Sequence, residues 1–130
     1  MLESPPPGWV RVTFDAAIKE SHVVLAAVCR KEDGSVSHAW MQVTNQGNSI
    51  WAEAMARLFA VSNAVKMSFP RVIFEGDAKL VFSPLVDPNC ELPWQVSSIL
   101  ADISSLCNSF VDWKFSVVKK DLNSLGHCVG

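Results

Sequence analysis

Three acidic residues occupy positions from which a carboxylate could take part in chemistry. Asp15 ends an alternating apolar run that is typical of a strand, and Asp77 ends a second such run directly after a glycine. Glu53 lies in the first turns of a segment rich in alanine, leucine and methionine, which predicts a helix. Small residues follow Glu53 along the same helical face. This face can therefore pack closely on a sheet and direct the carboxylate into the domain.

Each acid taken alone has a simple structural explanation. An aspartate at a strand end commonly forms a turn, and a glutamate in a first helical turn complements the helix dipole. Carboxylates that converge on one place repel one another and resist burial, and divalent cations usually relieve this cost. Two metal ions about 3.5–4 Å apart can activate a water and stabilise a leaving oxygen in phosphodiester cleavage. Convergence of Asp15, Glu53 and Asp77 would therefore create a candidate metal site.

The elements that must position these acids follow from the apolar pattern of the chain. Three strands are predicted first, as an antiparallel meander: residues 10–14, 22–30 and 36–43. A long helix over residues 49–66 and a fourth strand over residues 71–74 follow. The pattern then predicts two helices, a fifth strand and the start of a last helix: residues 78–86, 93–110, 111–117 and from Asn123 onward. This order implies an α/β fold with a five-stranded mixed sheet and helices on both faces.

The composition is that of one domain of ordinary size. The chain has 130 residues, of which 49% are hydrophobic and 18% charged, so a core is available. No apolar run reaches the ~18 residues that a membrane span needs. The net charge of −2 argues against a strongly basic nucleic-acid binder. Residues 1–8, with three consecutive prolines, are typical of a stiff lead-in from a longer chain, so the domain is predicted over residues 9–130.

The other reactive and aromatic side chains are predicted to be structural. The four cysteines form no C-x-x-C pair and no zinc-like spacing, which indicates reduced thiols in an intracellular protein, with nucleus and cytoplasm both open. His22 and His38 have no Cys or acidic partner at ligand spacing. Four tryptophans are expected to anchor the core, with base stacking as the alternative for one of them: Trp40, Trp51, Trp94 and Trp113.

Four motifs occur in order along the chain: VTFDAA, WAEAMARLFAV, VIFEGDAKLV and VVKKDLNSLGHCVG. Together they resemble the ribonuclease H fold, and most closely the plant branch of reverse-transcriptase-associated domains, from Trp9 to Gly130. In that family the first-strand Asp, the helix Glu and the fourth-strand Asp bind two magnesium ions. The resemblance therefore implies that Asp15, Glu53 and Asp77 are catalytic metal ligands. The fourth ligand of the family, which opens the last helix, corresponds to His127.

The resemblance implies hydrolysis of the RNA strand of an RNA–DNA hybrid by two Mg²⁺ or Mn²⁺ ions. Manganese would suit His127 better, because magnesium prefers oxygen ligands. The partner would be the hybrid or another nucleic acid, read by its shape and 2′-hydroxyls, and bound by a monomeric domain of a larger, retroelement-derived chain without membrane contact. Contacts with the nucleic acid are implied for six residues: Ala16, Asn45, Asn48, Lys119, Lys120 and Asn123.

The chain also departs from the family pattern where substrate would bind. Ala16 stands where the family usually has glycine, and no glycine occurs between Gly8 and Gly34. Side chains there could crowd the sugar–phosphate backbone, and the last helix is barely begun at Gly130, so it is expected to be truncated. These departures favour an alternative, a non-catalytic module of the same fold that binds nucleic acid or protein. A third candidate is another nuclease of this superfold, such as a junction resolvase or an integrase.

Overall fold

The computed structural model describes residues 5–77 and 94–118. In chain order the elements are β1 (Val10–Ile18), β2 (Val23–Arg30), β3 (Val36–Thr44), α1 (Ser49–Lys66), β4 (Arg71–Asp77), α2 (Trp94–Cys107) and β5 (Asp112–Val118). The helices predicted over residues 78–86 and from Asn123 lie outside the described residues. Every predicted element inside the described residues is present.

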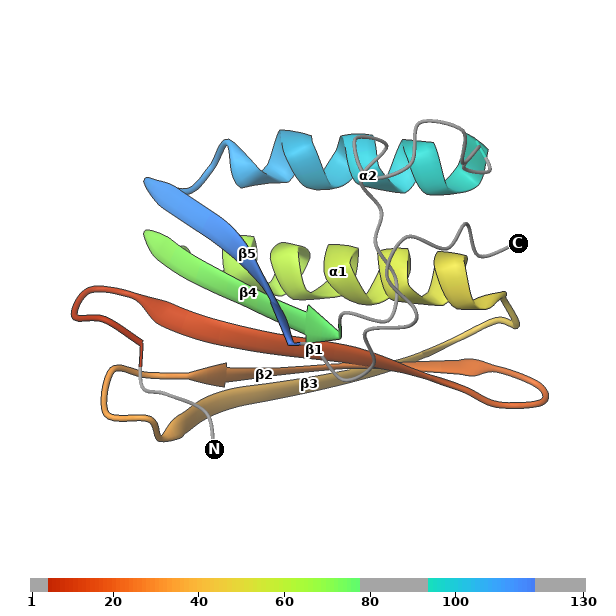
Figure 1. Ribbon diagram of the computed structural model, residues 1–130, viewed down its shortest axis with the longest axis horizontal. Helices are drawn as coiled ribbons and strands as arrows, with labels where there is room; N and C mark the ends of the chain where they lie inside the picture. The colour runs from red at the N-terminus through yellow and green to blue at the C-terminus, as the bar shows by residue number, and fades with distance from the viewer. Residues whose placement is uncertain (1–4, 78–93, 119–130) are drawn as a thin grey trace.

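The five strands form one mixed sheet in the order β3-β2-β1-β4-β5 (Figure 1). The pairs β1–β2 and β2–β3 are antiparallel, whereas the pairs β1–β4 and β4–β5 are parallel. β1 is therefore the central strand and joins the antiparallel meander to the parallel half of the sheet. This topology confirms the predicted α/β fold with a five-stranded mixed sheet.

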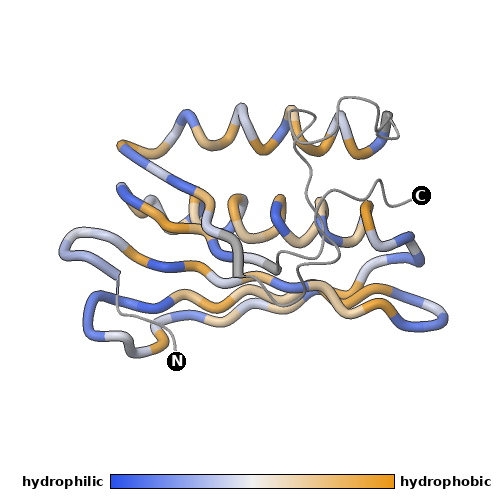
Figure 2. Tube along the Cα trace, in the orientation of Figure 1, coloured by the Kyte–Doolittle hydropathy of each residue, from blue (hydrophilic) through white to orange (hydrophobic). Residues whose placement is uncertain are grey.

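Both described helices lie on the same face of the sheet (Figure 1). Helix α1 packs on β1, β2 and β4, and α2 packs on α1. Alternate strand residues, such as Val12 and Phe14, enter the core beneath the helices. The residues between them, such as Arg11, face away from the helices. The sequence predicts helices on both faces of the sheet, and the two described helices lie on a single face (Figure 1). Figure 2 shows hydrophobic residues along the central strands and helices, and hydrophilic residues in the loops.

Helix α1 has the bounds predicted from the sequence, and both ends show why. Asn48 is the N-cap, and its side-chain oxygen accepts a hydrogen bond from the N–H of Trp51 at 2.8 Å. At the other end Ser68 has a left-handed φ of 58°, and its N–H bonds to the carbonyl of Val65 at 3.0 Å. Between these ends, fully buried alanines allow α1 to lie close to the sheet.

Several side chains predicted to be structural are so in the fold. Cys29 and Cys107 are buried free thiols, and the ring of His38 stacks on that of Trp40 at 5.5 Å between centroids. Trp113 is 40% exposed, so its prediction as a core anchor is wrong; β5 is an edge strand and buries less of its side chains. No helix in the described ranges is long and apolar enough to cross a bilayer.

Candidate active site

Asp15 lies within β1 and not at its end, which corrects the predicted strand boundary. The strand continues to Ile18 because β2 pairs with it this far, and Asp15 lies opposite Ala26. Its side chain is exposed, and its Oδ1 accepts a hydrogen bond from the N–H of Ala16 at 2.9 Å. The predicted metal ligand is therefore accessible to solvent. Ala16, which was predicted to contact nucleic acid, is half-buried beside it.

Asp77 is the last residue of β4, as the sequence predicts. β1 and β4 run parallel, and Thr13 pairs with Glu75. Asp15 follows Thr13 by two residues, and Asp77 follows Glu75 by two residues. Because side chains alternate along a strand, continuing this register places both aspartate positions at one level of the sheet and on one face. The description of Asp77 extends to its backbone only.

Glu53 lies on α1 and is only 8% exposed. Arg57 follows one helical turn later and is therefore its neighbour on the helix surface. Burial lowers the pKa of the Arg57 guanidinium, and the negative charge of Glu53 acts against this shift. A carboxylate that is taken out of water is strongly disfavoured unless a charge or hydrogen bonds compensate it. Arg57 supplies such a charge inside the domain.

Arg57 itself lies between two aromatic rings that belong to different strands. Its Cζ is 4.8 Å from the ring centroid of Phe115 in β5 and 5.8 Å from that of Phe14 in β1. Both distances are within the range in which the face of an aromatic ring attracts a cation. The guanidinium thus ties α1 to the parallel half of the sheet.

Gly76 has a steric reason to be glycine. A Cβ at this residue would lie 2.5 Å from Cζ of Phe14 and 2.6 Å from its Cε1, closer than real contacts allow. The ring of Phe14 therefore lies directly on the backbone of β4. Phe14 immediately precedes Asp15, and Gly76 immediately precedes Asp77, so this contact joins β1 and β4 one residue before each aspartate.

The structure places the positions of Asp15 and Asp77 on neighbouring parallel strands, and Glu53 on α1, which packs on β1 and β4. Within the described part of the chain, however, no group of three or more His, Cys, Asp or Glu side chains is arranged to hold a metal ion. Four predicted site residues lie outside that part: Lys119, Lys120, Asn123 and His127. The metal-ligand roles of Asp15, Glu53, Asp77 and His127 therefore stay predictions.

A buried ion pair on the outer face of the sheet was not predicted from the sequence. Nη1 of Arg11 donates a hydrogen bond to Oε2 of Glu75 at 2.6 Å, and the two side chains are 12% and 7% exposed. The available signal was the alternation of the strands, which puts Arg11 on the face of Asp15 and Glu75 on the face of Asp77. The pairing itself requires the β1–β4 register, which the sequence does not state.

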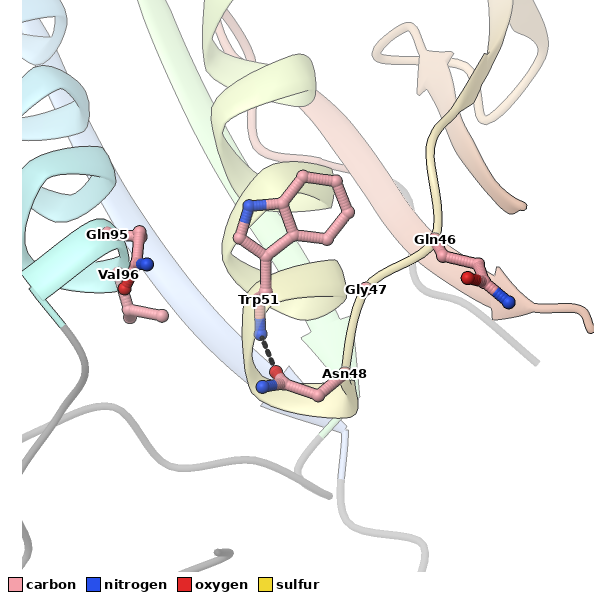
Figure 3. Close-up of a pocket in the computed structure, with 6 residues that line it drawn as sticks. All are labelled: Gln46, Gly47, Asn48, Trp51, Gln95 and Val96. Carbon is pink, nitrogen blue, oxygen red and sulfur yellow. Dashed lines mark hydrogen bonds between the residues drawn. The ribbon is translucent and has the colours of Figure 1, made fainter. Parts of the chain in front are cut away.

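A pocket of about 260 Å³ opens beside the start of α1 (Figure 3). Six residues line it: Gln46, Gly47, Asn48, Trp51, Gln95 and Val96. Gly47 must be glycine, because a Cβ there would lie 2.1 Å from the indole of Trp51. Gln46 is held by a hydrogen bond from its Nε2 to the carbonyl of Glu20. The lining is rich in amide groups, with one aromatic ring.

The pocket includes some of the predicted binding residues and adds others. Asn48 lines it, whereas Asn45 is exposed and is not among its lining residues. Gln95, at the start of α2, was missed because the sequence does not show that the two helices begin side by side. Trp51 packs against the core as predicted, and its half-buried indole also lines the pocket (Figure 3).

Comparison with protein families gives one match over most of the chain. The model of the family described as reverse transcriptase-like matches residues 13–129. A comparison with curated proteins finds no match. The family match includes WAEAMARLFAV and VIFEGDAKLV completely, and all but one terminal residue of each of the other two motifs.

Solved structures match the fold at low sequence identity. RNase H1 from the halophilic archaeon Halobacterium salinarum is 20% identical over 90% of each chain, with a TM-score of 0.75. LC11-RNase H1 in complex with an RNA/DNA hybrid is 14% identical over 85% of this chain and 86% of that one, with a TM-score of 0.70. A foamy viral protease-reverse transcriptase, also with an RNA/DNA hybrid, matches 97% of this chain with 20% of its own, at 16% identity and a TM-score of 0.64. The chain is thus a member of the reverse transcriptase-like family, and it has the ribonuclease H-like fold.

Proposed function

We propose that the protein is a metal-dependent endoribonuclease that cleaves the RNA strand of RNA–DNA hybrids. The observation that carries this proposal is the packing of Phe14 on Gly76, one residue before Asp15 and Asp77 on neighbouring parallel strands. Family membership and the fold support it. Two of the structural relatives are in complex with an RNA/DNA hybrid, which supports the same substrate class here.

The donor chemistry of these residues fits divalent ions. Carboxylate oxygens are the ligands that Mg²⁺ prefers and Mn²⁺ accepts. Asp15, Glu53 and Asp77 would hold two such ions, with His127 adding a nitrogen donor that favours Mn²⁺. The chemistry that paired divalent ions supply in phosphodiester cleavage is an activated water and a stabilised leaving oxygen. The chain itself positions the two aspartates through the strand register, and Arg57 sets a positive charge near Glu53.

The pocket at the start of α1 supports nucleic-acid binding next to these acids. Amide groups from Gln46 and Gln95 can donate hydrogen bonds to phosphate or 2′-hydroxyl oxygens and accept them from the hydroxyls. The indole of Trp51 offers a face on which a sugar or base can pack. Such contacts need no strongly basic surface, and they therefore agree with a net charge of −2. The substrate would then be recognised by shape and hydroxyls.

The decisive experiment is cleavage of a hybrid with a labelled RNA strand by the full chain, in Mg²⁺ and separately in Mn²⁺. We expect cleavage of the RNA strand only, faster in Mn²⁺, and a loss of at least about 100-fold in Asp77→Asn, since a carboxylate ligand is removed while the shape is kept. Circular dichroism of both proteins would show that the variant is folded. No cleavage with either ion by folded wild-type protein would refute the enzyme.

The pocket has its own test. Gln95→Ala should weaken hybrid binding several-fold in fluorescence anisotropy with Ca²⁺, because a hydrogen-bonding group of the pocket is removed. The side chain is exposed, so the free energy of unfolding should stay within about 0.5 kcal/mol of wild type. Gln42→Ala, an exposed glutamine on β3, is the matched control and should bind like wild type. Equal affinity of the Gln95 variant would exclude this pocket from substrate binding.

The alternative function is a module that binds nucleic acid without cleaving it. Ala16 favours it, because its N–H already donates a hydrogen bond to Oδ1 of the Asp15 carboxylate. This alternative shares the pocket with the nuclease and differs only in turnover. Hybrid binding that depends on Gln95, together with no cleavage in either ion, would establish the module in place of the enzyme.

A further inference from the structure

The Arg11–Glu75 ion pair joins the two strands that carry the predicted aspartate ligands. Arg11 belongs to β1 and Glu75 to β4, and their charged atoms are 2.6 Å apart with both side chains largely buried. On each strand the next residues of the same face lead to an aspartate, Asp15 in β1 and Asp77 in β4. The pair therefore lies just below the proposed metal site on the same face of the sheet.

The backbone ladder between these strands stops where the ion pair lies. The parallel β1–β4 pairing runs from Val10–Val72 to Thr13–Glu75, and in the described chain β1 beyond Thr13 pairs with β2 alone. No described ladder hydrogen bond therefore sets the spacing of the aspartate positions, which come two residues later. Among the described side chains, a charged hydrogen bond from Arg11 to Glu75 joins the two strands just before the aspartate positions, beside the apolar contact of Phe14 with Gly76.

The pair is poorly built for stability alone. Three buried atoms in this cluster have no hydrogen-bond partner in the described structure: Nε of Arg11, Oγ1 of Thr13 and Oε1 of Glu75. A buried ion pair contributes little net stability unless its remaining donors and acceptors are satisfied, and apolar side chains of similar size often serve as well or better. A directional, charged hydrogen bond differs from an apolar contact in fixing geometry.

We propose that Arg11 and Glu75 are positioning residues that hold Asp15 and Asp77 at the spacing that a shared divalent ion requires. This inference rests on the proposed function for the role of the aspartates. Outer groups that orient metal ligands typically change metal affinity by about 10–100-fold when they are removed. The pair performs this role from within the sheet, through the strands and not through contact with the ion.

The test separates positioning from stability by comparing single and double variants. Arg11→Met and Glu75→Met each leave one buried charge uncompensated and should unfold at lower urea concentration than wild type, whereas the double variant should regain most of the loss. Mn²⁺ affinity, measured by isothermal titration calorimetry on folded protein, should nevertheless remain about tenfold or more below wild type in the double variant. If Arg11→Met does not fold, Glu75→Gln takes its place among the single variants.

A second readout makes the result independent of the metal. Amide hydrogen exchange at residues 14–16 and 75–77 should be at least about tenfold faster in the double variant than in wild type, since the strand ends open locally. Val23→Ala, a buried change in β2, is the control: it should lower stability and keep both the affinity and the local exchange pattern. A double variant with wild-type exchange at these residues would overturn the inference.

The outcomes distinguish the two proposals. If the double variant exchanges faster at the strand ends but wild type binds no Mn²⁺, the metal site is rejected. The ordering of the strand ends by the ion pair would still stand. Faster exchange with unchanged Mn²⁺ affinity would show that the pair orders the strands without serving the site, and would overturn the inference. Both changes together support it.

Discussion

At the scale of single residues, neighbouring side chains compensate the charges that are buried inside the domain. Glu53 is buried beside Arg57, and the guanidinium in turn lies over the rings of Phe14 and Phe115. This arrangement places a cation close to a carboxylate that is only 8% exposed. A nearby positive charge lowers the cost of burying a carboxylate.

Cys107 is also buried, and burial changes the pKa of its thiol, a group that becomes charged only at high pH. Burial raises the pKa of its thiol to about 11, and the nearby charge of Arg57 partly opposes the shift. The unfolded thiol ionises near pH ~8.5. Between these values the unfolded state has lost its proton and the folded state has kept it, so the free energy of unfolding should fall as pH rises from 9 to 11.

Urea unfolding at several pH values would measure this fall, and Cys107→Ala is the comparison. Seven lysines and three other cysteines also titrate in this range, so the difference between the two proteins isolates the Cys107 thiol. The variant should be less stable at pH 8, because a buried side chain is truncated, yet show a shallower decline toward pH 11. Parallel declines in the two proteins would mean that the Cys107 thiol does not carry the effect.

At the scale of elements, the site depends on how closely two strands approach. The ring of Phe14 on β1 occupies the space that a side chain at Gly76 on β4 would need. A smaller side chain in place of Phe14, or a larger one in place of Gly76, would alter the distance between the strands that carry Asp15 and Asp77. The ion pair of Arg11 and Glu75 acts on the same two strands from the other face.

Gly76→Ala tests this close approach. The added methyl group should destabilise the fold by about 1–3 kcal/mol, the usual range for overpacking, as measured by urea unfolding. Phe14→Leu in the same chain makes room, so the double variant should be more stable than the sum of the two single changes predicts. Additive effects, or a Gly76→Ala protein as stable as wild type, would contradict the packing described here.

Local patterns made the elements predictable, and tertiary pairing caused the errors. The bounds of α1 were predicted correctly, because a run of helix-forming residues lies between Asn48 as N-cap and Pro70. The end of β1 was placed too early, because the alternation of apolar residues stops at Phe14 and only pairing with β2 extends the strand to Ile18. Trp113 was misplaced because the edge position of β5 is a property of the whole sheet.

At the scale of the whole molecule, the sequence predicted the acidic residues of the candidate site but not the residues that support them. Motif order indicated Asp15, Glu53 and Asp77, and the parallel pairing of β1 with β4 places the strands of the two aspartates next to each other. The residues that support them were missed, because Arg11 with Glu75, and Gln95 with the start of α1, are far apart in sequence. Such partners depend on strand register and helix docking, which a single sequence does not specify.

The contact between Phe14 and Gly76 also limits how this domain can vary over evolutionary time. The two residues belong to different motifs, yet they share one volume between the strands. A larger residue at position 76 requires a smaller one at position 14, so the two motifs must be compatible in side-chain size at these positions. A chimaera that takes one motif from a relative and keeps the other would inherit the mismatch directly beside both aspartates.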